Sequence, residues 1–92
     1  MKVEISPDLL QKIRKLSKVK RAGIGAAIES ARQVWGRPHE HSGIGIRNLG
    51  SGLYECRSGL DQRLVFQSFD GLLYFHFLGN HDEVRSFLRS HR

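Results

Sequence analysis

The feature that most constrains this fold is the stretch 53–81, in which three apolar runs alternate with two turn-forming clusters. The Asp70-Gly71 pair lies between two of these runs, and both central residues of a type I′ turn need positive φ. An Asp-Gly pair flanked by β-rich runs is therefore a strong signal for a hairpin. The stretch predicts three antiparallel strands in a meander, over residues 53–57, 63–69 and 72–78.

A strand and two amphipathic helices are predicted before this meander. Residues 1–6 alternate apolar and polar side chains, which is typical of a half-buried strand. Ser6 and Pro7 predict the start of the first helix, because the hydroxyl can cap free N–H groups and proline loses no hydrogen bond there. The second helix is predicted over 24–35, with Gly23 and Gly25 at its frayed beginning, since a glycine costs about 1 kcal/mol inside a helix.

The remaining segments complete an α+β fold. Residues 37–43 are predicted to form a polar loop, and 44–49 a fourth strand of the meander with Ile44 and Ile46 on one face. Asn80 is predicted to cap a short C-terminal helix. The expected domain, 1–92, has an N-terminal strand, a helical hairpin packed on an antiparallel four-stranded meander, and this last helix.

The charge of the chain favours a polyanionic partner. It has 15 Lys and Arg against 9 Asp and Glu, a net charge of +6 and a pI near 10.1. No acidic residue occurs between positions 9 and 28. The basic side chains of this segment predict contacts with a phosphate backbone that weaken with salt, although a solvated helix face is the alternative. The candidate RNA-binding residues are Lys12, Lys15, Lys18, Lys20 and Arg21.

The sequence also indicates where the protein is expected to act. No apolar run approaches the roughly 20 residues that a membrane span requires, so no membrane partner is expected. The N-terminal residues lack the apolar segment of a signal peptide. Cys56 is the only cysteine, which suits a reducing cytoplasm. We expect it to be a core residue, because its thiolate would need a matched histidine to act as a nucleophile.

Four side chains are candidates for catalysis. Glu55 and Arg57 alternate on one strand and share a face, and Arg63 on the next strand can share that face. His81 follows the last strand and can reach the same region. Arginines can stabilise a phosphate while an imidazole or carboxylate moves protons, so this set predicts a phosphodiester site on the uncovered side of the sheet. A surface ion pair between Glu55 and Arg57 is the alternative.

Other motifs predict less. The Gly23-Ile24-Gly25 segment lacks the preceding strand and third glycine of a dinucleotide loop. The group His39-Glu40-His41 could contact a metal, but no further ligands at suitable spacing follow, so no metal site is predicted. His76 lies in an apolar strand, where a hydrogen-bonded structural histidine is the favoured interpretation.

The order of elements and two sequence motifs resemble toxins of the RelE/ParE superfamily of bacterial toxin–antitoxin modules. The segments LYECR at 53–57 and QRLVF at 62–66 are similar to the LYELR and YRVLY forms of RelE- and HigB-like members. The ending FLGNHDEV at 77–84 is similar to the final strand of the family and its GxHxEV-like continuation. The resemblance covers nearly the whole chain and implies the RelE-like fold.

The resemblance implies an activity and assigns residues to it. RelE-like members are ribosome-dependent mRNA endonucleases. In their reaction the ribose 2′-hydroxyl attacks the adjacent phosphate, without a metal or other cofactor. By position in the motifs, Arg63 matches the arginine that contacts the scissile phosphate, Arg57 a basic position, and His81 a proton donor or acceptor. Glu55 matches a glutamate of open role. The implied partners are mRNA, ribosomal RNA at the basic first helix, and an antitoxin protein.

Two departures from the family leave other functions open. The C-terminal segment has no tyrosine, which some members use on the substrate, and only Phe87 is present there. No lysine pair stands on the second strand, so the general base is unassigned. ParE-like members share the fold but poison DNA gyrase through protein contacts. A member that only binds RNA or an antitoxin is a third alternative.

Overall fold

The computed structural model describes residues 1–41, 43 and 45–91, and these form nine helices and strands. In chain order, the elements are β1 (Lys2–Ile5), α1 (Pro7–Arg14), α2 (Lys18–Val34), α3 (Pro38–His41), β2 (Arg47–Gly50), β3 (Leu53–Ser58), β4 (Gln62–Phe69), β5 (Leu72–Gly79) and α4 (His81–Ser90). The predicted α+β fold, with its N-terminal strand, helical hairpin, meander and C-terminal helix, is confirmed.

The five strands form one sheet in the order β1-β5-β4-β3-β2. The strands of the meander pair antiparallel, as predicted, while β1 joins the edge of β5 in parallel. The predicted hairpin is present between β4 and β5, where Asp70 has φ 50° and Gly71 has φ 73°. Both values are positive, as a type I′ turn requires, so this local signal determined the register of the two strands.

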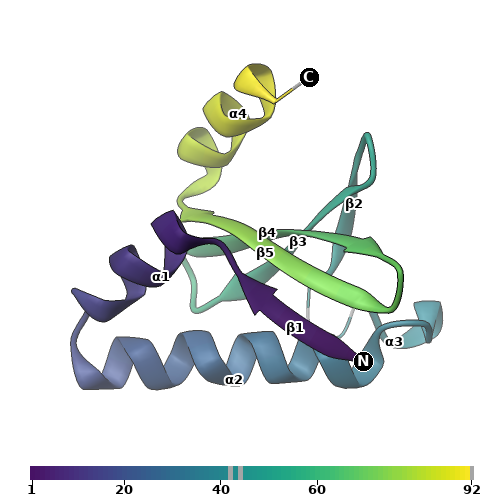
Figure 1. Ribbon diagram of the computed structural model, residues 1–92, viewed down its shortest axis with the longest axis horizontal. Coiled ribbons are helices and arrows are strands. Elements are labelled where there is room, and N and C mark those ends of the chain that lie inside the picture. Colours follow the sequence, from purple (N-terminus) through teal and green to yellow (C-terminus); the bar gives the residue numbers. More distant parts are fainter. Residues whose placement is uncertain (42, 44, 92) are drawn as a thin grey trace.

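Helices lie on both faces of the sheet (Figure 1). One face packs against α1 and α2, and its core contains Cys56, Leu64 and Phe66 of the sheet together with Leu9 and Ile24 of the helices. The opposite face packs against α4 through a smaller cluster of Leu53, Val65 and Val84. The face that the sequence analysis left uncovered is therefore partly covered by α4.

Each long helix begins at a side-chain cap. The Leu9 N–H donates to Ser6 Oγ at 3.2 Å, and the Lys20 N–H donates to Ser17 Oγ at 3.3 Å. At α4, Asn80 and Glu83 form a reciprocal capping box. A cap satisfies donors that the first turn leaves without intrahelical partners, so these polar residues determine where the helices start.

Three predicted boundaries are wrong. The Ser17 cap starts α2 at Lys18, so Gly23 and Gly25 lie inside the helix, not at a frayed beginning. A turn of helix, α3, interrupts the predicted polar loop, whose Ser42 lies outside the described residues. The fourth meander strand begins at Arg47, three residues later than predicted, and its predicted first residue, Ile44, also lies outside the description.

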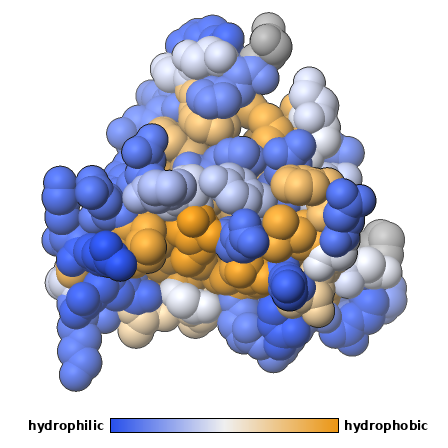
Figure 2. Space-filling model, viewed as in Figure 1, coloured by the Kyte–Doolittle hydropathy of each residue, from blue (hydrophilic) through white to orange (hydrophobic). Residues whose placement is uncertain are grey.

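The surface is mostly polar with one apolar band. Figure 2 shows hydrophilic residues over α4 and over the outer side of α2, with apolar residues across the middle of this face at the level of β1. Half-buried side chains from β1, α1 and α2 pack against the core, among them Val3, Ile5, Ile13 and Ile28. None of the helices in the described part of the chain is both long enough and apolar enough to span a bilayer.

Candidate active site

The strand register places two arginines beside Glu55 on the α4 face of the sheet. Arg47 on β2 stands directly opposite Glu55 on β3, and Val65 on β4 stands opposite it on the other side. Arg63 is two residues before Val65 on β4 and therefore points to the same face. Side chains at directly and diagonally opposite positions of neighbouring strands can touch, so both guanidiniums can reach the same carboxylate.

The carboxylate of Glu55 joins the two arginines. Arg63 Nη1 donates to Glu55 Oε1 at 3.2 Å, and Arg47 Nη1 lies 3.4 Å from the same oxygen. The side chain of Glu55 is 3% exposed, whereas those of Arg63 and Arg47 are 19% and 61% exposed. The prediction that Glu55 projects from an open surface is therefore wrong, because a residue of the inner strand β3 is enclosed by side chains from both neighbours.

Arg63 and His81 line one recess, as the sequence analysis expected. Arg63 pairs with Gly79 at the end of β5, and His81 begins α4 two residues later, so the strand pairing brings the two side chains to the same margin of the sheet. The recess has a volume of about 530 Å³. It is also lined by Leu60, Asp61, Gln62, Asn80 and Asp82.

Sequence reasoning missed three polar residues of this region. Asp61 and Asp82 line the recess with Arg63 and His81. The sequence predicted Asp61 as a turn residue and Asp82 as an acidic residue in the first turn of the last helix, and both have these positions. These local roles gave no indication that the two side chains also line the recess. Arg47 was also missed, although the predicted pairing of its strand with residues 53–57 would have placed it beside Glu55.

Arg57 does not line the recess of Arg63 and His81. It stands opposite Arg63 in the strand register, but its side chain lines a separate hollow beside α2, with Ala26, Ala27 and Ser30. Its stem also lies against Gly45, where an added Cβ would be 3.0 Å from Arg57 Cγ. The predicted convergence of both arginines with His81 is therefore found for Arg63 alone.

The predicted RNA-binding residues divide into two groups. Lys12 has a structural position, because its Nζ donates to the Leu78 carbonyl at 2.5 Å and lies 5.2 Å from the centre of the Phe77 ring. The other four side chains are exposed and have no hydrogen bond or ion pair within the described part of the chain: Lys15, Lys18, Lys20 and Arg21.

In the His39-Glu40-His41 motif, the described side chains of His39 and Glu40 contact each other, and Glu40 also pairs with Arg37. Glu40 Oε2 lies 3.0 Å from Arg37 Nε and 3.7 Å from His39 Nε2, and the side chain of His41 lies outside the description. Among the described residues, no group of three or more His, Cys, Asp or Glu side chains could hold a metal ion.

His76 and Cys56 have the structural positions that were predicted. His76 Nε2 shares a hydrogen bond of 3.1 Å with Gln67 Oε1, and burial, with a smaller effect of His91, lowers the pKa of this imidazole. Cys56 is a buried free cysteine, and burial raises the pKa of its thiol to about 12, with a smaller effect of the nearby Glu55 charge. A thiol with so high a pKa is not a nucleophile at neutral pH.

Comparison with solved structures identifies the fold. Neither a model of a known protein family nor the sequence of a curated protein matches this chain. A chain of the archaeal RelE–RelB complex from Pyrococcus horikoshii superimposes with a TM-score of 0.66 and 20% identity, over 86% of this chain and 92% of that one.

Two structures from E. coli are similar to the same degree. A chain of the intact RelBE toxin–antitoxin complex gives a TM-score of 0.65 at 17% identity, over 86% of this chain and 94% of that one. The isolated RelE toxin gives 0.65 at 16% identity, over 96% of each chain. At these identities the likeness concerns the arrangement of helices and strands. The chain therefore has the fold of the RelE toxins.

Proposed function

We propose that this protein is the toxin of a type II toxin–antitoxin pair and that it cleaves mRNA on the ribosome in the cytoplasm. The observation that carries the proposal is the recess in which Arg63 and His81 meet, with Arg63 held by a buried carboxylate. The RelE-like fold supports it, and so do the unpaired basic side chains of α2, because these offer a surface for ribosomal RNA.

In the proposed reaction, the ribose 2′-oxygen attacks the adjacent phosphorus while its proton passes to a base. The bond from phosphorus to the 5′-oxygen breaks, and that oxygen takes up a proton and leaves as a hydroxyl. The products are a 2′,3′-cyclic phosphate and a 5′-hydroxyl end. Arg63 offsets the negative charge that develops on the phosphate oxygens, and His81 carries one of the protons.

The structure suggests different roles for the remaining candidates. Glu55 already accepts a hydrogen bond from Arg63 and faces Arg47, so we assign it to holding the two guanidiniums. The side chain of Arg47 is more exposed than that of Arg63, and we assign it to a second contact with the phosphate. Arg57 lies in the hollow beside α2 and is assigned to RNA binding away from the reacting phosphate.

The test is a reconstituted translation reaction with the purified protein, followed by mapping of mRNA ends by primer extension. We expect cuts in ribosome-bound mRNA and none in the same mRNA without ribosomes. Loss of the Arg63 donor is expected to lower the cleavage rate by about 10²–10³-fold. Loss of the His81 imidazole is expected to lower it by about 10²–10⁴-fold.

The variants are Arg63→Ala and His81→Ala, and Arg32→Ala is the matched control. Arg32 is paired with Glu29 on the exposed side of α2 and is absent from the recess, so its loss is expected to leave cleavage unchanged. Growth arrest that persists in both recess variants, with DNA breaks that depend on gyrase, would contradict the nuclease proposal. It would indicate a ParE-like toxin that acts on gyrase. Absence of arrest and cleavage in every form would favour a protein that only binds RNA or an antitoxin.

A further inference from the structure

The strand β1 forms an open edge of the sheet. It pairs with β5 on one side, and no strand in the described part of the chain lies on its other side. The Ser6 N–H donates to the Phe75 carbonyl at 2.9 Å, and the Lys2 N–H donates to the turn before β5. Alternate residues of a strand direct these groups to opposite edges, so the N–H and C=O groups of Val3 and Ile5 point outward. Such a row can pair with another strand.

The opposite edge of the sheet is less suited to pairing. There the register of β2 shifts between Asn48 and Gly50, where the Gly50 N–H donates to Asn48 Oδ1 at 2.8 Å, and the strand begins with the charged Arg47. Bulges and charged side chains are common means by which proteins keep an edge from pairing. The register of β1 with β5 is unbroken from Lys2 to Ile5. A regular strand is therefore open at the β1 edge.

The side chains of β1 differ between its two faces. Val3 and Ile5 pack against the core that α1 and α2 cover, but both are only half-buried. Met1, which precedes the strand, is 49% exposed. Lys2 and Glu4 alternate with the apolar residues and are exposed. Figure 2 shows the apolar band at the level of β1 on this side of the molecule. The edge thus offers apolar contacts as well as hydrogen bonds.

We propose that two copies of this chain pair through β1, antiparallel, about a two-fold axis at Val3. In this register Val3 faces Val3 of the second copy, and the two residues exchange N–H···O=C bonds. Lys2 of each copy then stands opposite Glu4 of the other, so the symmetry creates two pairs of opposite charge. One sheet continues through both copies, with α1 and α2 of each on the same face and the apolar bands beside the axis.

The charges of β1 select this register and this occupant. An axis moved by one residue, to Lys2 or Glu4, would place like charges directly opposite each other, which is destabilising. With the axis at Val3, the strand is complementary to itself. The net charge of +6 on each copy opposes association, and the paired edge is short. We therefore expect a weak dimer with a Kd of about 10⁻⁴ M.

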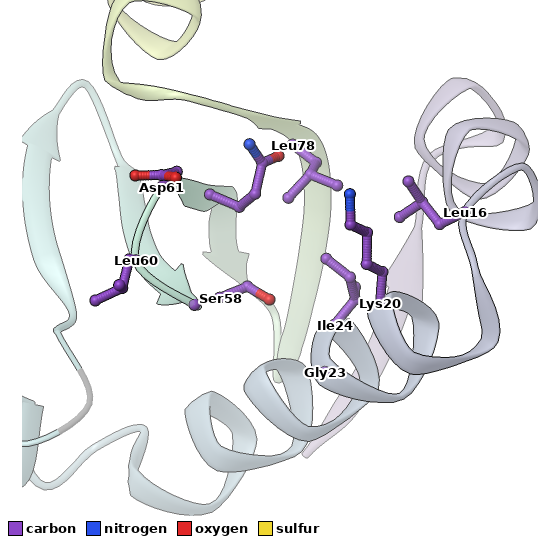
Figure 3. A pocket seen from close by; sticks show the side chains of 10 residues that line it. Leu16, Lys20, Gly23, Ile24, Ser58, Leu60, Asp61 and Leu78 are labelled. Carbon is purple, nitrogen blue, oxygen red and sulfur yellow. The ribbon is translucent and has the colours of Figure 1, made fainter.

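Pairing through β1 does not involve two other sites of the molecule. The described residues that line the recess of Arg63 and His81 include none from β1. The same holds for the hollow between α2 and the β3–β4 turn, where Figure 3 shows Leu16, Lys20 and Leu78. The inference is thus independent of the proposed nuclease, and either can fail without the other.

The test is sedimentation equilibrium of the full chain, with amide hydrogen exchange measured by NMR at low and high concentration. We expect the mean mass to rise from one copy toward two. Exchange of the Val3 and Ile5 amides should slow as the concentration rises, while that of Lys2 and Glu4, which face β5, should not change. In a mixture of labelled and unlabelled protein, an isotope-filtered NOE should connect the Val3 methyl groups of the two copies.

Charge reversals test the register. Lys2→Glu and Glu4→Lys are each expected to weaken the dimer by about tenfold or more, because the symmetry turns two attractive pairs into repulsive ones. The double variant with both changes should restore dimerisation. The two reversals change the net charge in opposite directions, so a general charge effect cannot weaken association in both. Lys15→Glu is the matched control, because it is exposed outside β1 and changes the net charge as Lys2→Glu does.

A second pair of variants tests the backbone contact. Val3→Pro removes an outward N–H group and should abolish the dimer, since proline is tolerated where the N–H of an edge strand faces solvent. Val3→Ala loses the same side chain but keeps the N–H, and it should still dimerise more strongly than the proline variant. Thermal scans establish that both variants are folded. If the proline variant does not fold, the charge reversals still decide.

Four results would contradict the proposal. The first is a protein that stays monomeric up to about 1 mM, ten times the expected Kd. The second is a dimer that neither charge reversal weakens. Exchange that slows at Asn48 and not at Val3 would assign the contact to the β2 edge. Exchange at Val3 and Ile5 that slows only when single-stranded RNA is added would assign the β1 edge to RNA.

Discussion

The guanidinium of Arg63 is tied to the buried carboxylate of Glu55, with Nη1 of the arginine 3.2 Å from Oε1 of the glutamate. The two residues occupy diagonal positions on β3 and β4, and Arg47 approaches the same oxygen from β2. Arg63, the arginine proposed to contact the phosphate, is thus held by a carboxylate that has little access to solvent. We therefore propose that Glu55 acts as a positioning residue for Arg63.

Replacing Glu55 by glutamine removes the charge and keeps the size of the side chain. We expect Glu55→Gln to lower the free energy of unfolding by about 1–3 kcal/mol, because a hydrogen bond to a charged group loses its charged acceptor. Cleavage should fall as well, since Arg63 is held less firmly. Urea denaturation and single-turnover cleavage measure the two effects.

The matched control for this change is Glu29→Gln. Glu29 also pairs with an arginine, Arg32, but on the exposed surface of α2. Exposed ion pairs contribute little, so we expect no measurable change in its unfolding midpoint or cleavage rate. If the Glu55 variant equals the parent in both measurements, the positioning role is wrong.

Gly25 is a site at which alanine should stabilise the protein. It lies inside α2, and an added Cβ would have no atom within 4 Å. Alanine lowers the entropy of the unfolded chain, so Gly25→Ala should raise the free energy of unfolding by about 0.5–1 kcal/mol. The melting temperature should rise by several degrees in a thermal scan. Gly71→Ala, at φ 73° in the hairpin turn, should lower it.

Cys56 should make the protein less stable at alkaline pH. Burial raises its folded-state pKa from 9.0 to about 12, so between these values the unfolded chain has lost the thiol proton while the folded chain retains it. The free energy of unfolding should therefore fall as the pH rises through this window, by up to about 1.4 kcal/mol per pH unit. Urea denaturation of Cys56→Ala should show a smaller slope, and equal slopes would contradict the prediction.

His76 should make the protein less stable at mildly acidic pH. Its folded-state pKa lies below the ordinary value of 6.5, chiefly through burial, so the unfolded chain binds the proton more readily. The free energy of unfolding should fall as the pH decreases through 6.5 toward the lower folded-state pKa. His76→Gln has no imidazole to titrate, and its stability should depend less on pH in this range. A parent and variant with parallel pH profiles would exclude this cause.

Local patterns were sufficient for the elements that are specified by neighbouring residues. Asp70 and Gly71 predicted a hairpin because the turn needs two positive φ angles, and Ser6 and Asn80 predicted helix starts because their oxygens reach N–H groups three residues later. The start of α2 was missed although Ser17 is a cap of the same kind, because the cost of two glycines was given more weight. That cost is small against a helix of 17 residues that packs on the sheet.

The candidate site divides in the same way. The alternation of side chains correctly placed Glu55 and Arg63 on one face, and the end of the last strand correctly placed His81 near Arg63. Whether that face was open, and where each long side chain lay on it, depended on segments distant in sequence. β2 brought Arg47 against Glu55, α4 covered part of the face through Val84, and the space beside α2 admitted Arg57.

The sequence by itself determined the last three strands of the meander, the caps at Ser6 and Asn80, the hairpin and the shared face of Glu55 and Arg63, because periodicity and hydrogen bonds to near neighbours are local properties. Only the tertiary structure decided that Glu55 is buried between two arginines and that Arg57 is separated from His81. Long polar side chains follow the charges and free volume that other elements supply, and a one-dimensional pattern contains neither.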